Sequence, residues 1–446
     1  MKNMTTGNVY GLILRFALPV FISQLFQQLY NAVDSMIVGK FLGTEALAAV
    51  SSSGTLIFLL VSFFEGVAVG AGVLISRKFG ENDADGVSRA VHTDLALAGV
   101  CGIVLTLVGV FCTPTFLRWI RIDPDVFPQA VSYFRYYFLG ALSLVIYNMC
   151  RGIMMAVGDS RRPLYYLIFS SCVNVVLDLL FVGAFHWGVW SAAFATVIAQ
   201  TLSAVLCLVQ LSRKGSAISI EFRRIRFYKA ELLQTLRYGI PSGVQNSVIG
   251  FANVIVQSQI NSFGTVATAA YGTHSKIEGF AFLPITSFNM ASTTFVSQNL
   301  GARQYGRAKR GARFSILAAM LLAELVGVGY VTGSRFLFGL FTSDAAVLDM
   351  GAGIAQIVTP FYFLLAFSHA VAAVCRGAGK AVVPMTVMLS VWCVFRVSYI
   401  ITVMHFFGTW QLIYWAYPIT WGISSVIYLF YYLFSDWVHG FEKEKT

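Results

Sequence analysis

Long apolar stretches, separated by short polar segments, run through the whole chain. Twelve of them are long enough to cross the hydrocarbon core of a bilayer as helices, which takes about 20 residues each. They cover residues 12–38, 45–75, 92–115, 129–150, 163–185, 188–212, 236–261, 268–299, 313–341, 351–375, 383–407 and 411–434. The strands of a membrane barrel would instead show short alternating segments of about ten residues. The pattern therefore predicts an all-α integral membrane protein with twelve transmembrane helices.

The sequence repeats itself after about 221 residues. A shift of 221 places several residues of segment 43–49 on identical residues of segment 264–270. A shift of 222 aligns LRFALP, which ends at Pro19, with LRYGIP, which ends at Pro241. The register hardly changes along the chain, so we interpret the sequence as a duplication.

Each repeat contains six of the predicted helices, an even number, so both copies enter the membrane in the same direction. Two such lobes are related by a pseudo-two-fold axis along the membrane normal, and paired bundles of this kind are typical of transporters. We expect an N-lobe at residues 1–211, a polar cytoplasmic linker at 212–235 and a C-lobe at 236–446.

Composition and charge agree with a membrane location. Apolar residues make up 57% of the chain and charged residues 11%, and the mean hydropathy is +0.72. Of the 31 Lys and Arg residues, 24 fall at alternate ends of the spans, which the positive-inside rule assigns to the cytoplasm. Both termini are therefore expected in the cytoplasm. The net charge of +11 then reflects topology, and a nucleic-acid partner is not expected.

Acids inside apolar stretches are candidates for function, because a charge near the bilayer centre costs at least about 2.5 kcal/mol. Asp34, Asp178 and Thr196 lie about five, seven and nine residues from the predicted outer ends of their spans, at similar depth. Asn174 precedes Asp178 by four residues and so lies on the same helix face. We predict that these four side chains form a cation-coupling site, at which the two carboxyl groups take up a proton or share a cation.

The second repeat provides an internal control for this site. The positions of Asp34, Asn174, Asp178 and Thr196 are taken in the second repeat by Ile255, Phe395, Tyr399 and Tyr417. The fold thus does not require acids at these positions, which favours a functional role for the first set.

Other polar residues inside the spans are candidates for a substrate cavity. They are Gln245, Asn253, Gln257, Glu278, His369 and Arg396. The first three lie at i, i+8 and i+12 and share one helix face. Hydrogen bonds that join helices are the alternative interpretation for such residues.

Two further acids and one proline complete the set of unusual residues. Glu65 stands beside Gly66 and Gly70, whose spacing of four more often marks close helix packing. For Glu324 we favour a structural role against a neighbouring helix. Pro19 removes a backbone hydrogen bond about four turns before the acid of the first span, and we expect a hinge there; a bend that serves packing alone is the alternative.

Several motifs together resemble the multidrug and toxic compound extrusion (MATE) family. They are the opening segment LPVFISQLFQQLYNAVDSMIVGKFLGTEALAAVS, the loop SRKFGENDADGVSRA with its echo SQNLGARQYGRAKRG, and GDSRRP after the fourth span. The resemblance covers nearly all of the chain. It implies a V-shaped pair of six-helix lobes that exports organic cations and drugs, driven by inward movement of protons or sodium.

The resemblance also implies roles for single residues. Asp34 in YNAVDSMIVG matches the family's aspartate of helix 1, Asn174 and Asp178 in NVVLD resemble its helix 5 pair, and Thr196 resembles the helix 6 threonine of the N-lobe cation site. Asp34 and Asp178 would be metal ligands only if the coupling ion is sodium. A large branch of the family carries acids in helices 7 and 10, whereas the seventh span here has none and the tenth has His369, so a C-lobe sodium site of that type is not expected.

We therefore predict a multidrug antiporter of the bacterial cytoplasmic (inner) membrane that works by rocker-switch alternating access. We expect no cofactor besides the coupling ion, and a monomer among membrane lipids. The alternative is a flippase for a lipid-linked precursor, whose anionic pyrophosphate would favour several basic cavity residues, while Arg396 is the one firm candidate. No enzyme is expected, because we find no HExxH motif, no paired His ligands and no Ser, His and Asp set at one depth.

Overall fold

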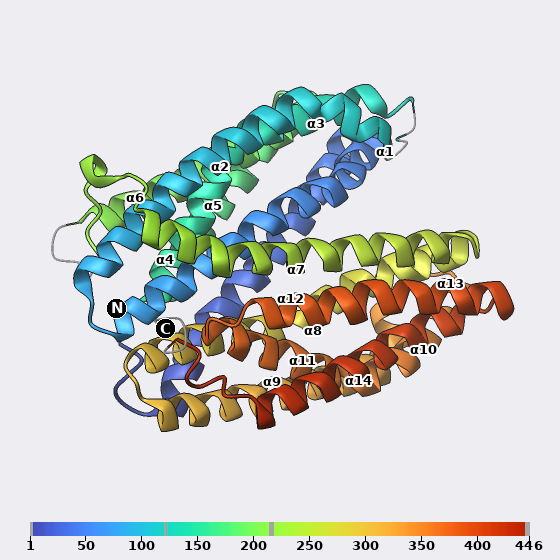
Figure 1. The fold of residues 1–446 in the computed structure, drawn as a ribbon. Coiled ribbons are helices and arrows are strands. Elements are labelled where there is room, and N and C mark those ends of the chain that lie inside the picture. Colours follow the sequence, from blue (N-terminus) through green and yellow to red (C-terminus); the bar gives the residue numbers. More distant parts are fainter. Residues whose placement is uncertain (1–2, 120–121, 123, 214–217, 442–446) are drawn as a thin grey trace. The chain divides into compact units, whose positions relative to one another are not determined.

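The computed structural model describes residues 3–119, 122, 124–213 and 218–441, and within these ranges all regular secondary structure is helical (Figure 1). In this part of the chain, eight helices are long and apolar enough to cross a membrane, or nine when one pair bent by 48° is counted as a single span. The prediction of an all-α membrane protein is confirmed.

Helices occupy all twelve predicted spans. The first repeat contains α1 (Val9–Gly80), α2 (Ala84–Trp119), α3 (Phe127–Leu139), α4 (Ala141–Ala156), α5 (Arg161–Asp178), the π-helical η1 (Leu179–Ala184) and α6 (Trp190–Ser212), and the short 3-10 helix η2 (Phe222–Arg224) follows. The second contains α7 (Lys229–Asn261), α8 (Thr265–Gly301), α9 (Tyr305–Gly339), α10 (Ala345–Val358), the 3-10 helix η3 (Thr359–Phe361), α11 (Tyr362–Gly377), α12 (Val382–Val387), the π-helical η4 (Met388–Phe395), α13 (Arg396–Phe406) and α14 (Trp410–Phe434). The long α1 supplies the first two spans, and α3 with α4 forms the bent fourth span.

The duplication is visible in the backbone conformation. Three pairs of residues 221 positions apart have positive φ angles: Gly43 (85°) and Gly264 (92°), Asn82 (56°) and Arg303 (56°), and Gly158 (82°) and Gly379 (75°). At Gly43 the backbone leaves helical geometry, which divides α1 into its two spans. Glycine suits such a position because it has no Cβ to clash in the left-handed region. The two repeats therefore turn in the same way at the same places.

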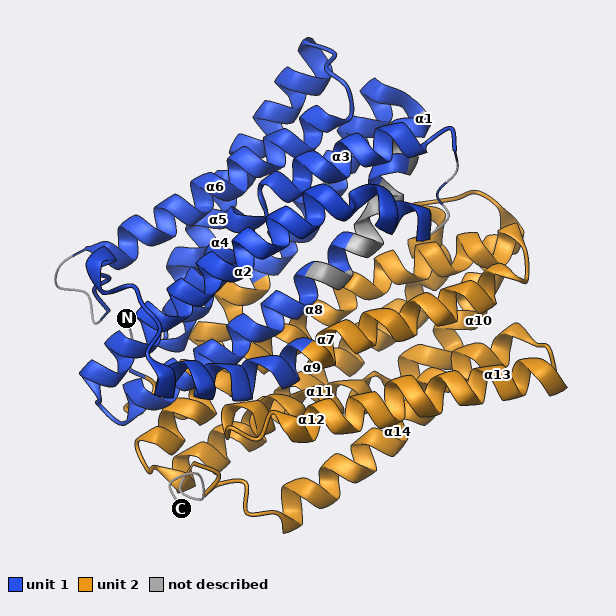
Figure 2. Ribbon diagram, turned by 45° about the horizontal axis from the view of Figure 1, so that its top comes forward, with its two compact units in different colours: residues 1–3, 22–243 blue, residues 4–21, 244–446 orange. Residues whose placement is uncertain are grey.

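The chain divides into two compact units, and the boundaries between them fall inside two helices, α1 and α7 (Figure 2). Unit 1 consists of Met1–Asn3 and Ile22–Gly243, and unit 2 of Met4–Phe21 and Val244–Thr446. The changes at Phe21 and Gly243 each fall two residues after a proline, Pro19 and Pro241, and so follow the 222-residue shift of the sequence. The first part of α1 thus belongs to unit 2 and the first part of α7 to unit 1. The lobe boundaries expected at residues 211 and 236 stay predictions.

Inside unit 1, the second span of α1 packs directly against the first part of α7. A Cβ atom added at Gly66 would lie 2.4 Å from the Cα atom of Gly243, and one added at Gly70 would lie 2.3 Å from the Cα atom of Gly239. Glycines four residues apart on both helices therefore allow the backbones to touch. This confirms the close packing predicted from Gly66 and Gly70.

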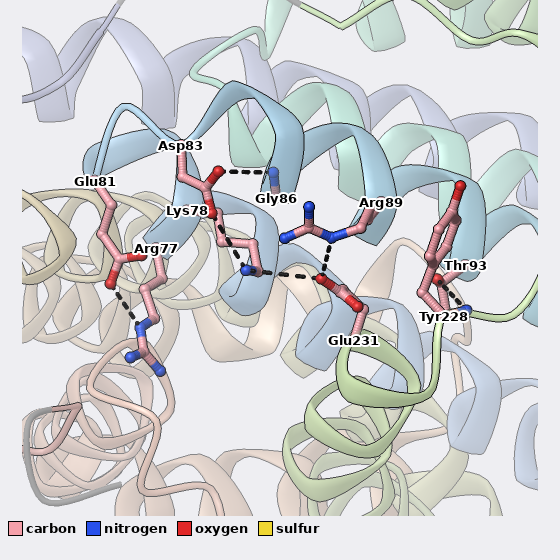
Figure 3. Close-up of polar contacts among 9 residues, drawn as sticks. All are labelled: Arg77, Lys78, Glu81, Asp83, Gly86, Arg89, Thr93, Tyr228 and Glu231. Atoms are coloured by element: carbon pink, nitrogen blue, oxygen red, sulfur yellow. Dashed lines mark hydrogen bonds and ion pairs between the residues drawn. The ribbon is translucent and has the colours of Figure 1, made fainter. Parts of the chain in front are cut away.

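The start of α7 is also held to the polar segment between α1 and α2 (Figure 3). The buried carboxylate of Glu231 accepts a hydrogen bond from Arg89 Nε at 2.8 Å, and Lys78 Nζ lies 4.0 Å from it. Asp83 accepts a hydrogen bond from the backbone N–H of Gly86 and pairs with Lys78 at 3.5 Å. Burial raises the pKa of Asp83, but the hydrogen bond and the charge of Lys78 together hold it below its usual value. These contacts fix the first turn of α7 within unit 1.

Candidate functional site

The structure brings the four residues of the predicted cation-coupling site together in one buried cluster of unit 1. Asp34 lies on α1, Asn174 and Asp178 near the end of α5, and Thr196 on α6; none is more than 9% exposed. The carboxyl groups of Asp34 and Asp178 are within hydrogen-bonding reach of each other. In the amide orientation that satisfies both neighbours, Asn174 donates to Asp178 Oδ2 at 3.2 Å and accepts from the backbone N–H of Thr196 at 3.2 Å.

The two carboxyl groups are not fully satisfied by the protein. In the described part of the chain, Oδ1 of Asp34 and Oδ1 of Asp178 are buried without a hydrogen-bond partner. Two touching carboxyl groups in a dry site cannot both stay ionised, so the pair needs a shared proton or a cation. Among the described residues, no group of three or more His, Cys, Asp or Glu side chains could hold a metal ion. The oxygen atoms of Asp, Asn and Thr are nevertheless a ligand set that suits a hard cation.

Helix geometry changes at this point of α5. Asp178 is the last residue of the regular α-helix, and the π-helical η1 begins directly after it. Single π-helical turns are rare and are found frequently at functional sites. The backbone is therefore irregular where one of the two acids stands.

An apolar cluster closes the acid pair on one side. It contains residues one helical turn away from the acids and from Thr196, all largely buried: Ile37 and Val38 on α1, Val182 on η1, and Ala192 and Ala193 on α6. These residues lie nearer the predicted outer ends of their helices than the acids do. On that side the acids are therefore bordered by packed apolar side chains.

A cavity of about 170 Å³ adjoins the acid pair on the other side, within unit 1. Asn174 and Thr196 line it, whereas Asp34 and Asp178 do not. Three groups of side chains give the cavity its character, namely the amides of Gln27, Asn31, Asn148 and Gln200, the tyrosines Tyr30, Tyr137 and Tyr147, and the acid Glu65. Among the described residues, Glu65 is the only acid that lines the cavity, and no Lys, Arg or His lines it.

In unit 2, an arginine surrounded by aromatic rings occupies part of the corresponding region. Arg396 is 1% exposed and donates two hydrogen bonds to Thr420 Oγ1, at 2.6 and 3.2 Å. Its guanidinium carbon lies 4.8 Å from the ring centroid of Trp392 and 4.5 Å from that of Tyr417. Tyr417 is the residue that matches Thr196 of the first repeat. Unit 2 thus has a cation and aromatic ring faces around the repeat position equivalent to Thr196, which belongs to the acid site of unit 1.

Glu278 belongs to the same polar region of unit 2. Its carboxylate lies 3.8 Å from Nε2 of His274, and Nδ1 of His274 is 2.7 Å from the hydroxyl of Tyr330. Glu278 interacts electrostatically with Arg396, although no ion pair within 4.0 Å joins the two in the part of unit 2 that the structure describes. Glu278 therefore lies in the same polar region as Arg396 without a direct ion pair among the described residues.

The remaining cavity candidates lie in different surroundings. Gln245 is buried and accepts a hydrogen bond from Arg376 Nη1 at 3.1 Å, whereas Asn253 and Gln257 are exposed on unit 2. His369 contacts aromatic rings of α8 and η4, and its Nε2 has no hydrogen-bond partner among the described residues. The three polar residues of α7 thus do not share one environment.

Glu65 is the site residue whose position the sequence analysis missed. The glycine neighbours suggested packing, and they do pack, but Glu65 itself lines the cavity. One residue along a helix turns the side chain by roughly 100°, so Glu65 points away from the face that carries Gly66. This angular offset could have indicated from the sequence that Glu65 lies off the packing face. By contrast, Glu324 accepts a hydrogen bond from the backbone N–H of Phe363 at 3.1 Å, in line with its expected structural role.

Comparisons with known proteins identify the family. The MatE family model matches residues 19–180 and again residues 241–402, which follows the duplication. "Probable multidrug resistance protein YoeA" of Bacillus subtilis (strain 168) is 26% identical over 431 residues, covering 94% of this chain and 92% of the relative. "Multidrug export protein MepA" of Staphylococcus aureus (strain N315) is 21% identical over 350 residues, covering 78% and 77%.

A solved structure shows the same fold. It is described as the outward-facing conformation of a multidrug resistance MATE family transporter of the MOP superfamily. The TM-score is 0.90 at 21% sequence identity, and the alignment covers 100% of this chain and 99% of the other. The twelve-helix fold predicted from the apolar pattern is therefore one that a known transporter adopts.

Proposed function

The chain belongs to the MATE family of multidrug efflux transporters, and from this premise we propose that it is an antiporter that exports organic cations in exchange for protons. The observation that carries the proposal is the buried contact between Asp34 and Asp178 beside a cavity in which Glu65 is the one acid among the described lining residues. A pair of touching carboxyl groups binds one proton readily, because the second negative charge is unfavourable without it. The names of the relatives support organic drugs as the class of cargo.

The coupling follows from electrostatics. When the acid pair gives up its proton, unit 1 gains a negative charge next to the cavity, which favours a cationic substrate there. When the pair is protonated, that attraction is lost and the substrate leaves. A proton and a cation that each weaken the binding of the other are exchanged rather than carried together, once the lobes open alternately to the two sides.

Orientation is part of the proposal. We place both termini in the cytoplasm, because most Lys and Arg residues lie at that set of helix ends. The apolar cluster beyond the acids then faces outward and the cavity faces the cytoplasm. Pro19 is proposed as a hinge, which is supported by the change of α1 from unit 2 to unit 1 two residues later.

The test is ethidium efflux from vesicles that carry the protein, with a pH gradient or a sodium gradient imposed separately. We expect the pH gradient to drive efflux, and Asp34→Asn and Asp178→Asn to abolish it. Glu324→Gln is the matched control, since this intramembrane acid caps a backbone N–H, and an amide oxygen can still accept that bond. Efflux driven only by sodium would make sodium the coupling ion, with Asp34 and Asp178 as its ligands.

If ethidium moves under neither gradient, the antiporter proposal is wrong. Translocation of a lipid-linked precursor is then the next assay. The comparisons do not favour this alternative, since the relatives reported above are named as multidrug transporters.

A further inference from the structure

We propose that Glu65 binds the positive charge of the substrate, at a site separate from the acid pair that takes up the coupling ion. The inference rests on the proposed function and adds to it the residue and the chemistry that recognise the cargo. The cargo is expected to be an amine or quaternary ammonium compound whose cationic group enters the cavity of unit 1.

The charge of the cavity supports this assignment. Among the described lining residues, Glu65 is the only acid, and none is basic. Glu65 forms no hydrogen bond or ion pair with another described residue. Its charge acts on the cavity residues Tyr137 and Tyr147, and the charge of Arg151, which does not line the cavity, also acts on Tyr147. A half-buried carboxylate at a cavity wall attracts a cationic ligand, which supplies the partner that the described residues do not provide.

The other lining groups suit the same ligand. Tyr30, Tyr137 and Tyr147 bring three aromatic rings to the cavity wall, and a ring face attracts an organic cation by cation–π interaction. The amide oxygens of Gln27 and Asn31 can accept hydrogen bonds from a protonated amine. An anionic ligand would find one carboxylate and no cation in this wall.

The size of the cavity sets a limit on what it holds. Its volume of about 170 Å³ is below the range of about 300–1,000 Å³ that drug-sized ligands occupy. In this conformation the cavity therefore accepts a small cation, or the cationic end of a larger molecule.

Glu65 is separated from the coupling pair by two residues of the cation-coupling site. Asn174 and Thr196 line the cavity, and Asn174 also donates to Asp178 Oδ2. Tyr30 and Thr196 both line the cavity, so the cavity wall includes a residue of the same cluster. Substrate and coupling ion therefore have different carboxylates, and they influence each other through the field across this layer rather than by occupying one site.

Packing does not explain Glu65. Its helix contacts α7 through Gly66 and Gly70, whose missing Cβ atoms allow the close approach. The carboxylate takes no part in that contact. Replacing Glu65 by Gln removes the charge and keeps the shape, so the helix contact is expected to survive.

The experiment measures ethidium binding and proton release together, with the purified full-length protein in lipid nanodiscs. Ethidium fluorescence gives the affinity, and a pH indicator in weakly buffered solution gives the protons released per bound ethidium. The variants are Glu65→Gln, Glu65→Asp and Asp34→Asn. Glu45→Gln is the matched control, because Glu45 is an exposed acid on the same helix.

For Glu65→Gln we expect affinity to fall about tenfold or more while proton release at saturation remains. Glu65→Asp keeps the charge and is expected to restore most of the affinity, and Glu45→Gln should behave as wild type. Asp34→Asn is expected to lose proton release. Wild-type affinity in Glu65→Gln, or loss of proton release without a change in affinity, would overturn the inference and leave the antiporter proposal standing. Failure of the wild-type protein to bind ethidium would overturn both.

Discussion

Units 1 and 2 share their turns but differ in the chemistry of their cores. Positive φ angles recur at Gly43 and Gly264, and at Gly158 and Gly379, so the two repeats bend at equivalent places. Yet unit 1 buries a pair of carboxyl groups, while unit 2 buries Arg396 among aromatic rings. The same backbone fold thus holds buried acids in one unit and a buried arginine in the other.

The difference also concerns how well each charge is satisfied. Arg396 donates to Thr420 and lies against the faces of two rings, which are favourable partners for a guanidinium group. Within the described part of the chain, Asp34 and Asp178 each leave one buried oxygen without a hydrogen-bond partner. A satisfied buried charge stabilises its surroundings, whereas an unsatisfied one is available to bind an ion. This difference supports the proposal that unit 1 binds the coupling ion, while the charge of Arg396 in unit 2 is mainly structural.

The largest expected effect on stability comes from Arg396→Ala. The substitution leaves a hole between Trp392 and Tyr417 and removes both hydrogen bonds to Thr420, which should lower the free energy of unfolding by about 3–5 kcal/mol. Thermal unfolding of the detergent-solubilised protein measures the loss. Arg335→Ala is the control, because this exposed arginine pairs with Asp349 at the surface, and a loss of about 1 kcal/mol or less is expected. Equal losses would contradict a structural role for Arg396.

An intermediate effect is expected at the contact between α1 and α7. Gly70→Ala places a Cβ 2.3 Å from the Cα atom of Gly239, so backbone must move, at a cost of about 1–3 kcal/mol. The matching residue of the second repeat is Ala291, which is buried, so unit 2 has room for that methyl group. Gly72→Ala is the control on the same helix, since its Cβ would meet nothing closer than 3.6 Å. Similar melting temperatures for the two variants would mean that the close contact is absent.

The smallest effect on stability is expected for Asp178→Asn. Replacing one of two touching carboxyl groups by an amide removes a repulsion, so the free energy of unfolding should stay within about 1 kcal/mol of wild type or rise. The same thermal unfolding assay tests this, run beside efflux. Stable protein without coupled efflux would separate function from folding in unit 1. A destabilisation as large as that of Arg396→Ala would instead make Asp178 a structural residue.

Much of this organisation could be predicted from the sequence. Apolar run length locates the helices, because each must span the same hydrocarbon thickness. The similar depth of four residues along their helices predicted that they lie close together, because neighbouring spans cross the same bilayer. The structure groups these residues, Asp34, Asn174, Asp178 and Thr196, in one cluster. The aromatic replacements in the second repeat were visible as well.

Other features depend on contacts that an apolar pattern does not encode. The changes of unit at Phe21 and Gly243 lie inside continuous helices, where hydropathy gives no boundary. Glu65 was obscured by Gly66 and Gly70, because one helix read alone does not reveal which face borders a cavity. The polar residues of α7 were grouped by helix angle, yet Gln245 is bonded to Arg376 while Asn253 is exposed.

The most direct test of the difference between the units compares Asp34→Asn with Glu278→Gln in proteoliposomes. Each variant removes one intramembrane acid, the first from unit 1 and the second from unit 2. The measurement is ethidium movement driven by a pH gradient, normalised to the amount of folded protein. We predict that Asp34→Asn abolishes this movement and that Glu278→Gln retains it. Retained movement in Asp34→Asn together with its loss in Glu278→Gln would place the coupling site in unit 2 and contradict the account.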